Sequence, residues 1–422
     1  MRSRSVSPAK LARTASQLLF LGLITWVAWQ MWTGVRGATI EKYCPFGGVE
    51  TILPWLRKTG TLCSLSTLNL SMMAGVLVMT VVLKRAFCSH VCPIGTISEW
   101  VSRLGRRLHL RVDVPRKVDR PLRYVKYLGL IAIIVFTYRV QELIFREVDP
   151  FFVLFTLGRG HGIAEGVIGI GQASLWIVIG LLAAGLVVPM LFCRYLCPFA
   201  AFLTPFSRLG AARVRRNETH CTSCGKCDRA CDWGLLVSQK PSVTNGECSN
   251  CQACVQACPV PGALSFGFRA PGAASPAAES ERIEKVESPL PARPSARPAL
   301  FSLLFPPIVA GLFFAAIFAG QAWELPTMQH TFDQAGSASQ SERVEMIVEG
   351  LRCRGTSAFL VQRLQAVPGV LGVETYVQEH RATISYDPAK LTVEAIRGKI
   401  DEPVLLNDGR QVQAFHVTEI KD

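Results

Sequence analysis

Acidic residues are scarce in this sequence. Its 422 residues include 31 Asp and Glu against 45 Lys and Arg, which gives a formal charge of +14. A positive excess of this size could indicate a protein that binds nucleic acid. The basic residues, however, cluster beside apolar runs, which is typical of the cytoplasmic loops of membrane proteins. The charge pattern therefore argues against nucleic acid as a partner and favours membrane lipid.

The sequence also lacks a convincing signal-peptidase site after its first apolar run, residues 16–34. Arg2, Arg4, Lys10 and Arg13 precede this run. A basic start followed by an apolar run is shared by signal peptides and membrane anchors. The missing cleavage site favours an uncleaved anchor.

Half of the residues are hydrophobic, and their distribution predicts an α-helical membrane protein. Five segments approach the ~20 residues that a helix needs to cross a bilayer: 16–34, 65–84, 123–141, 172–193 and 299–322. Basic residues are dense after the second and fourth segments, so the positive-inside rule places the N-terminus and those two loops in the cytoplasm. Residues 35–64 and 142–171 would face the other side of a bacterial inner membrane. Pro306-Pro307 predicts a kink or a late helix start in the fifth segment.

Two copies of one motif lie 105 residues apart. The motif is Phe-Cys-x3-Cys-Pro, and the copies begin at Phe87 and Phe192. Cysteines four residues apart share one helical face. Proline disfavours helix at the residue before it, so each membrane helix should end at Cys92 or Cys197. We call the four cysteines of the two motifs the inner thiols: Cys88, Cys92, Cys193 and Cys197. If the copies meet, these thiols would suit an iron–sulfur cluster or a soft metal such as copper; the alternative is ordinary packing of buried cysteine.

A second helix is predicted after the first motif. Its apolar face consists of Ile94, Ile97, Trp100, Val101 and Leu104. An amphipathic helix of this kind would lie in the cytoplasmic interface of the membrane.

The repeat extends to the opposite side of the membrane. The same shift of 105 residues pairs Cys44–Phe46 with Asp149–Phe151. Segments one and two thus match segments three and four as parallel repeats, which often enclose a site at their interface. Cys44 and Cys63 could form a disulfide, contact a metal or be inert.

Several other residues could take part in acid–base or ligand chemistry. Glu147, Asp149 and His161 are candidates for accepting protons from a quinol, because that reaction needs a base near the membrane surface. The alternative is that they are solvated loop residues. His90 lies inside the first motif and could be a ligand, a hydrogen-bond donor to a cluster sulfur or an interfacial residue.

Eight further cysteines follow the spacing of a bacterial two-cluster ferredoxin. Two runs of Cys-x2-Cys-x2-Cys-x3-Cys begin at Cys221 and Cys248. Close spacing lets one loop wrap three thiolates around a cube, and the fourth cysteine of each run ligates the other cluster. The first ferredoxin set is therefore Cys221, Cys224, Cys227 and Cys258. The second ferredoxin set is Cys231, Cys248, Cys251 and Cys254. Zinc is the alternative, and Asp232 stands where a proline usually follows the first run.

With these motifs the chain resembles the membrane polyferredoxin family of periplasmic nitrate and nitrous oxide respiration (NapH- and NosR-like), and the related oxidase assembly factor of CcoG type. The resemblance covers about residues 15–268. It implies electron transfer between the quinone pool, or a cytoplasmic donor, and a redox partner across the membrane. The oxidase assembly relative implies copper reduction instead.

Residues 343–419 resemble a heavy-metal-associated domain with a ferredoxin-like βαββαβ pattern. Strands are predicted at 344–349, 371–378, 381–386 and 411–418, with helices ending near 366 and spanning 391–401. Metal-carrying relatives have Cys-x2-Cys in the first loop, where this chain has Cys353 and Thr356. One thiolate is a poor Cu(I) site, which favours a docking or vestigial role. Cys353 could still share a metal with a partner's thiol.

The sequence predicts five parts. They are a four-helix membrane core (1–216), a 2[4Fe-4S] ferredoxin domain (217–268), a flexible linker (269–298), a fifth membrane helix (299–322) and the heavy-metal-associated-like domain (343–419). The ferredoxin domain would be cytoplasmic and the C-terminal domain periplasmic.

The functional hypothesis is an inner-membrane protein with two [4Fe-4S] clusters, and with a third cluster or copper at the inner thiols. It would pass electrons between the quinone pool, or a cytoplasmic donor, and a periplasmic redox protein or metalloenzyme. As an enzyme it would be a component of a quinol dehydrogenase or a metal reductase. The alternatives are a factor that reduces or delivers copper during metalloenzyme assembly, and a redox sensor.

Overall fold

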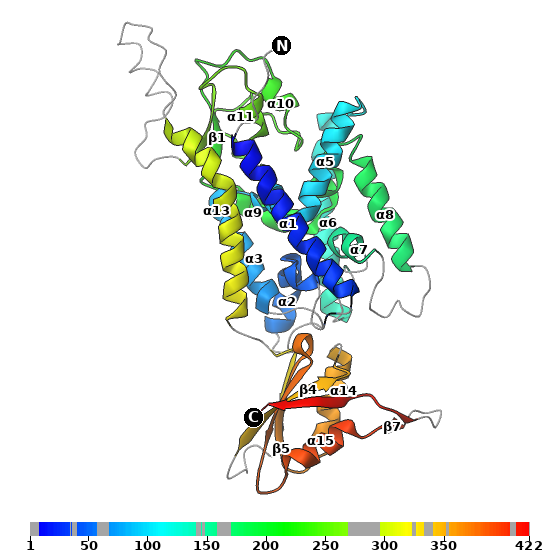
Figure 1. Cartoon of the computed structure of the whole chain (residues 1–422). Helices are drawn as coiled ribbons and strands as arrows, with labels where there is room; N and C mark the ends of the chain where they lie inside the picture. Colours follow the sequence, from blue (N-terminus) through cyan, green and yellow to red (C-terminus); the bar gives the residue numbers. More distant parts are fainter. Residues whose placement is uncertain are drawn as a thin grey trace. The chain divides into compact units, whose positions relative to one another are not determined.

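The computed structural model describes the following residues: 8–33, 35, 40–56, 67–140, 145, 148–157, 170–268, 296–322, 326–332, 341–351, 354–405 and 411–421. The chain forms two compact units (Figure 1). The first consists of Met1–Trp26, Ala74–Ile133 and Phe145–Ala316. The second consists of Val27–Met73, Ile134–Ile144 and Ile317–Asp422. The first unit therefore contains both Cys-x3-Cys-Pro motifs together with the ferredoxin loops.

Three helices in the described part of the chain are long and apolar enough to cross a membrane. They are α1 (Pro8–Trp32), α6 (Arg116–Val140) and α13 (Ala296–Gln321). The other two predicted segments correspond to shorter apolar helices, α3 (Thr67–Leu83) and α8 (Ile170–Ala184). Length and composition thus support three of the five predicted crossings directly.

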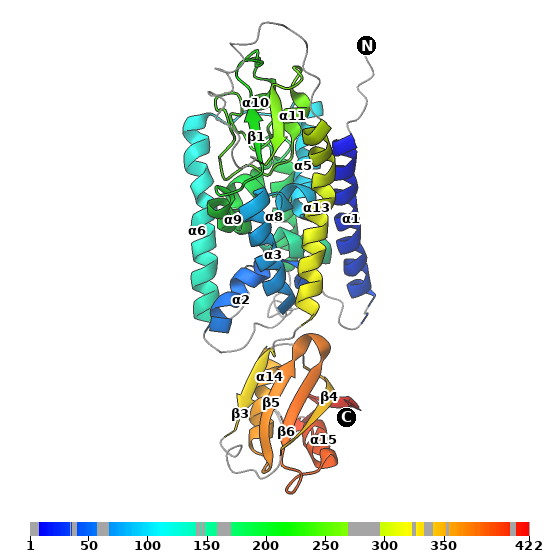
Figure 2. The ribbon, with the colours of Figure 1, turned by 90° about the vertical axis from the view of Figure 1, so that its left-hand side faces the viewer.

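Helix α13 runs through both of its prolines. It begins ten residues before Pro306, so the expectation of a late helix start is wrong. Neighbouring helices can re-satisfy the backbone groups that a proline frees in a membrane helix, and α13 is well packed here. Phe313 meets Phe20 of α1 with ring centroids 5.5 Å apart, and Figure 2 shows α1 and α13 side by side.

The chain breaks helical geometry before each motif cysteine pair. After α3, Lys84 adopts a left-handed φ of +58°, and a four-residue helix, α4 (Phe87–His90), follows. After α8, Met190 has a φ of +55°, and a five-residue π-helical turn, η4 (Phe192–Leu196), follows. The membrane helices therefore end earlier than the predicted Cys92 and Cys197. The left-handed Lys84 directly follows α3, whereas α8 already ends at Ala184 and turns lead on to Met190.

The prolines act locally as expected. Cys92 and Cys197 are extended, with ψ of 119° and 114°, and each caps a new helix whose first residue is the proline. These helices are α5 (Pro93–Arg107) and α9 (Pro198–Ser207). Proline is well suited to the first position of a helix, because an N–H there would have no intrahelical partner and its absence costs no hydrogen bond.

Helix α5 buries a different face from the apolar one in its sequence. Ser98, Glu99 and Ser102 are buried, whereas Leu104 is 48% exposed. Glu99 pairs there with the buried Arg13 and the partly exposed Arg103. Of the predicted apolar face, Ile94 is buried, Ile97, Trp100 and Val101 are half-buried, and Leu104 is exposed.

A short helix begins at each of the two Pro-Phe sequences that the shift of 105 residues pairs. Helix α7 (Pro150–Thr156) begins with Asp149 as its cap, since the Asp149 carboxylate accepts a hydrogen bond from the Phe151 N–H at 3.1 Å. Its phenylalanines are buried, and it packs against α5 and α8. In the second unit, η1 (Ile40–Tyr43) leads into α2 (Phe46–Leu56), and Asn69 donates to the carbonyls of Glu41 and Cys44.

The ferredoxin loops are closed by a short antiparallel pair, β1 (Arg213–Arg216) with β2 (Leu264–Gly267). Between them lie α10 (Lys226–Arg229) and α11 (Ala253–Ala257). Each cysteine loop contains two left-handed residues at matching places: Ser223 and Gly225 in the first, Asn250 and Gln252 in the second. These turns curl each loop so that its cysteines can converge.

The C-terminal domain is a five-stranded sheet with two helices. The strand order is β3-β5-β6-β4-β9. Its strands are β3 (Met328–Thr331), β4 (Glu342–Glu349), β5 (Val370–Tyr376), β6 (Arg381–Tyr386) and β9 (His416–Lys421). Its helices are α14 (Arg354–Gln365) and α15 (Val393–Asp401), with a 3-10 turn η6 (Val377–Glu379) and a small hairpin of β7 (Val404–Leu405) and β8 (Gln411–Val412). The βαββαβ pattern is present, and β3 adds an edge strand that the sequence did not indicate.

Candidate iron–sulfur sites

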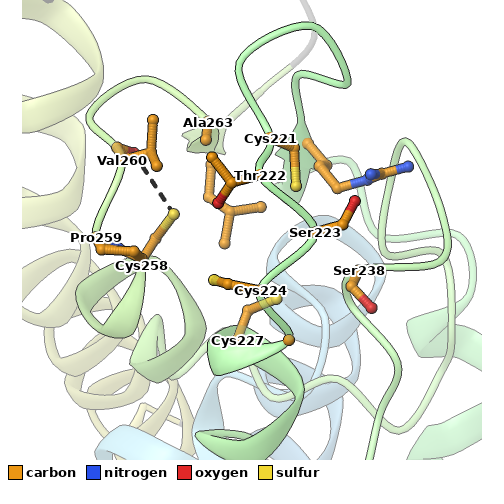
Figure 3. Close-up of a pocket in the computed structure, with 13 residues that line it drawn as sticks. Cys221, Thr222, Ser223, Cys224, Cys227, Ser238, Cys258, Pro259, Val260 and Ala263 are labelled. Atoms are coloured by element: carbon orange, nitrogen blue, oxygen red, sulfur yellow. Dashed lines mark hydrogen bonds between the residues drawn. The ribbon is translucent and has the colours of Figure 1, made fainter.

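The four cysteines of the first ferredoxin set surround one cavity. Cys221, Cys224 and Cys227 come from the first cysteine loop, and Cys258 comes from the end of the second (Figure 3). The open cavity has a volume of about 350 Å³, including space shared with solvent. Cys224 is exposed. Folding thus brings Cys258 to the same cavity as three cysteines that lie 31 or more positions earlier in the sequence.

Cations and backbone amides surround this first set. Hydrogen bonds from the Ser223 N–H and the Arg216 guanidinium lower the pKa of the Cys221 thiol. The backbone N–H of Lys226, and then its ammonium, lower the pKa of Cys224. These groups stabilise thiolates, which are the form that ligates iron.

The second ferredoxin set is more deeply buried. Burial, followed by the thiolates of Cys251 and Cys248, raises the pKa of Cys231 to about 12. Cys254 is raised well above its usual pKa by burial and by the same neighbours. The four thiols therefore lie close enough to repel one another when ionised.

The inner thiols form a third group. Burial and the neighbouring thiolates of Cys88 and Cys197 raise the pKa of Cys92. Burial, together with Cys88, raises the pKa of Cys197 to about 12. The two motifs, 105 residues apart, thus place their cysteines beside one another.

These three groups fit multi-iron clusters. None of the described cysteines is in a disulfide. Burial and mutual repulsion disfavour the thiolates of the second set and the inner thiols, and bound iron would supply the positive charge that stabilises them. Among the described residues, no three Cys, His, Asp or Glu side chains are gathered for a single ion.

Arg13 of α1 joins the second ferredoxin set to the first motif. Its Nη1 donates to the Cys251 carbonyl and its Nε to the Ser89 carbonyl, both at 3.1 Å, and it pairs with Glu99. The Ser89 hydroxyl also donates to the Ser249 carbonyl at 2.8 Å. The loop of the second ferredoxin set therefore contacts the residue that follows Cys88.

A second buried charge cluster lies beside this contact. Glu247 precedes Cys248 and pairs with Arg85 at 2.7 Å and with Lys126 at 2.5 Å. Arg85 also lies over the Trp233 ring at 4.7 Å. The cations lower the pKa of Glu247 to about 2 against its burial. Arg85 and Lys126 also oppose the rise in pKa that burial gives Cys88.

Sequence reasoning missed these charged residues. Lys84, Arg85 and Lys126 follow the second apolar segment and look like basic loop residues in sequence, yet their side chains are fully buried. Asp232 replaces the usual proline and pairs with Arg106 and, at 3.3 Å, with Arg111. The one available signal was the position of Glu247 directly before a ligand cysteine.

The other candidate residues are placed as follows. Asp149 lies near enough to Cys197 to contribute to that thiol's raised pKa. His90 Nδ1 lies 3.0 Å from the Ala86 carbonyl, and its ring packs on Phe305. Cys44 belongs to the second unit. Cys63, Glu147, His161 and Cys353 lie outside the described residues.

Family models match the same segments. A 4Fe-4S binding domain matches residues 65–111 and again 170–217, so each copy of the repeat is matched separately. A 4Fe-4S dicluster domain matches 213–270, and a heavy-metal-associated domain matches 345–403.

Curated proteins are also similar to the chain. YccM of Escherichia coli, whose name describes an electron transport protein, is 34% identical over 276 residues, which is 62% of this chain and 76% of YccM. The chain belongs to the membrane-bound 4Fe-4S polyferredoxin family. The ferredoxin-type protein NapH of Escherichia coli is another relative, 29% identical over 183 residues (42% of this chain and 59% of NapH). No solved structure matches the chain.

Membership of the polyferredoxin family confirms the resemblance that the cysteine motifs indicated. The names of these polyferredoxin relatives support an iron–sulfur electron-transfer role, and the domain matches support 4Fe-4S clusters as cofactors.

Proposed function

We propose that this polyferredoxin transfers electrons through three [4Fe-4S] clusters in a fixed order. The first would be held by Cys221, Cys224, Cys227 and Cys258, the second by Cys231, Cys248, Cys251 and Cys254, and the third by the inner thiols. The Arg13 and Ser89 contacts between the second ferredoxin set and the first motif carry the proposal. The separate match of each repeat to a 4Fe-4S binding domain supports the third cluster.

The exposure of the cysteines indicates which cluster lies nearest to solvent and which lies nearest to the membrane. Cys224 is exposed, whereas Cys231 and Cys254 are buried and the inner thiols Cys88 and Cys193 are buried too. Electrons would thus enter or leave the protein at the first set, and the inner thiols would lie nearest the membrane. Buried arginines and lysines beside the second set and inner thiols would balance the negative charge of thiolate-bound clusters.

We further propose that the chain crosses the inner membrane five times. In this arrangement the ferredoxin loops would be cytoplasmic and the C-terminal domain periplasmic, as the positive-inside rule predicts from the basic loops. The electron partner beyond the inner thiols would be the quinone pool or a periplasmic redox protein. Asp149, which is near Cys197, would be the proton acceptor if that partner is a quinol.

Iron and acid-labile sulfide analysis of the purified protein tests the three-cluster proposal. We expect about twelve irons per chain, since each cube holds four. Replacing Cys88 and Cys193 with serine should reduce the iron content to about eight per chain, while the EPR signals of the clusters in the first and second ferredoxin sets persist. A count of eight in the unaltered protein would refute the third cluster.

Reaction partners can then be separated by kinetics. Clusters that a quinol reduces would support the quinone pool as donor. Clusters that quinol leaves oxidised, but that reduce Cu(II) after chemical reduction, would assign the protein to copper handling instead. The match to a heavy-metal-associated domain is the observation that favours this second function.

A further inference from the structure

The first ferredoxin set opens beside two exposed cations of α10. The Arg229 guanidinium donates to the Cys224 carbonyl at 3.1 Å. Lys226 lies close enough to Cys224 to lower its pKa. Both side chains are exposed, as is Cys224 itself.

The beginning of α6 continues this basic surface. Arg111 Nη1 donates to the Arg229 carbonyl at 3.1 Å, and Arg123 Nη2 donates to the Trp233 carbonyl at 2.8 Å. These bonds hold the start of α6 against the segment that follows Cys227. The exposed basic residues of this surface, which we call the basic rim, are Arg116, Lys117, Arg120, Lys226 and Arg229.

The nearby acidic residues do not neutralise the basic rim. Within residues 103–123 and 216–240, all of which are described, the exposed carboxylates are Asp113 and Glu218. Asp113 pairs with Arg111 at 3.1 Å, and Glu218 pairs with Arg216 at 2.6 Å. Both acids are thus matched by cations outside the rim, which keeps its own positive charge.

The part of the basic rim around α10 suits a water-soluble partner. No large hydrophobic side chain of residues 216–267 is exposed, whereas Val118 and Leu122 are exposed beside the cations of α6. Surfaces that insert into a lipid interface combine basic residues with exposed aromatic or aliphatic ones. The α10 part of the rim is charged, lacks exposed apolar side chains and lies next to the first ferredoxin set, which favours a transient protein complex guided by electrostatic attraction there.

We propose that the basic rim docks a small acidic one-electron carrier protein, such as a flavodoxin or ferredoxin, which exchanges electrons with the first ferredoxin set. This inference rests on the proposed function, because it needs a cluster held by those cysteines. In each encounter the reduced carrier loses one electron and the cluster gains it, and no bond or proton needs to move. Opposite charges would hold the carrier over Cys224, the exposed ligand.

Binding of a purified acidic flavodoxin to the full chain in neutral-lipid nanodiscs tests this inference without relying on turnover. We expect the affinity to fall as salt is added, because exposed charges are screened. The double variant Lys117→Glu/Arg120→Glu should bind at least about tenfold more weakly at low salt, since charge reversal on a docking surface adds repulsion. It leaves the Arg229 contact to the cysteine loop intact.

Arg343→Glu is the matched control. Arg343 is exposed on β4 of the other unit, so the same kind of charge reversal there should leave flavodoxin affinity unchanged. Equal weakening by Arg343→Glu, or no weakening by the double variant, would overturn the inference. Binding of phosphatidylglycerol vesicles by the rim, with no flavodoxin binding, would assign it to lipid and overturn it as well.

Iron content measured on the same samples keeps the two proposals apart. Unaltered protein that holds at least eight irons yet does not bind flavodoxin overturns the docking inference alone. Unaltered protein without iron overturns the proposed function and the inference with it. A double variant that keeps its iron and EPR signals shows that its weaker binding is not a folding defect.

Discussion

At the scale of single residues, buried ion pairs hold the ferredoxin loops to the membrane part. Glu247 is matched by Arg85 and Lys126, whose side chains are fully buried. Removing one partner of such a cluster leaves charges without compensation, which destabilises proteins far more than the loss of an exposed pair does. The main role of the Glu247 carboxylate is therefore to neutralise these two buried cations.

We predict that Glu247→Gln destabilises the protein by about 3–5 kcal/mol, the range for breaking a buried charge cluster. Thermal unfolding in detergent, followed by the visible absorbance of the clusters, would measure the change. Glu402→Gln is the control, because the Glu402 side chain is 52% exposed and its ion pairs are on the surface. Equal effects of the two substitutions would contradict the role of Glu247.

The same residue predicts a pH dependence. The pKa of Glu247 is lowered to about 2 in the folded protein, below its unfolded value of about 4.3. A lowered carboxylate pKa stabilises the fold above the unfolded pKa, and this stabilisation is lost as pH falls toward the folded pKa. The difference in stability between wild type and Glu247→Gln should therefore be constant near neutrality and shrink below about pH 4. A difference that does not change with pH would contradict this assignment.

At the scale of elements, the turn from each motif into its next helix depends on close backbone packing. A Cβ added to Gly95 of α5 would lie 2.0 Å from the Cys88 carbonyl oxygen. That oxygen belongs to the backbone and cannot move without shifting a predicted ligand. Gly95 is thus required by the approach of α5 to the first motif.

We predict that Gly95→Ala lowers thermal stability and reduces iron at the inner thiols, toward about eight per chain on the four-iron stoichiometry. Gly129 of α6 is the matched control, because a Cβ there meets nothing within 4 Å. Gly129→Ala should be neutral or stabilising by up to about 1 kcal/mol, the usual gain in helix propensity. Iron analysis and thermal unfolding of both variants check the prediction, and a tolerated Gly95→Ala would contradict the close approach.

At the scale of the whole molecule, the five-crossing topology is open to a labelling test. We expect a membrane-impermeant maleimide to label His416→Cys in β9 of intact spheroplasts, and Lys240→Cys of the ferredoxin loops only after lysis. Both positions are exposed, so access to reagent alone would decide labelling. Labelling of Lys240→Cys before lysis would reverse or refute the orientation given by the basic loops.

Much of the architecture was predictable because its causes are local. The spacing of Cys221 to Cys258 indicated the ferredoxin loops, and proline fixed the extended conformation of Cys92 and Cys197. The first three predicted C-terminal strands correspond to β4, β5 and β6, whereas the predicted strand at 411–418 is divided between β8 and β9. The edge strand β3 was missed because it has only four residues and precedes the segment that resembles a heavy-metal-associated domain. The ends of α3 and α8 were misplaced, because neither the left-handed Lys84 nor the turns that follow Ala184 have a sequence signature.

The sequence by itself determined the chemistry of the protein: which thiols occur in cluster-binding spacings, that two motifs repeat, and that apolar helices accompany them. Only the tertiary structure decided where the charges lie. Arg13, Arg85 and Lys126 look like surface cations in sequence, but their partners Cys251 and Glu247 are 238, 162 and 121 residues away. Burial of a charge depends on such distant partners, and local pattern cannot reveal a partner that only folding brings near.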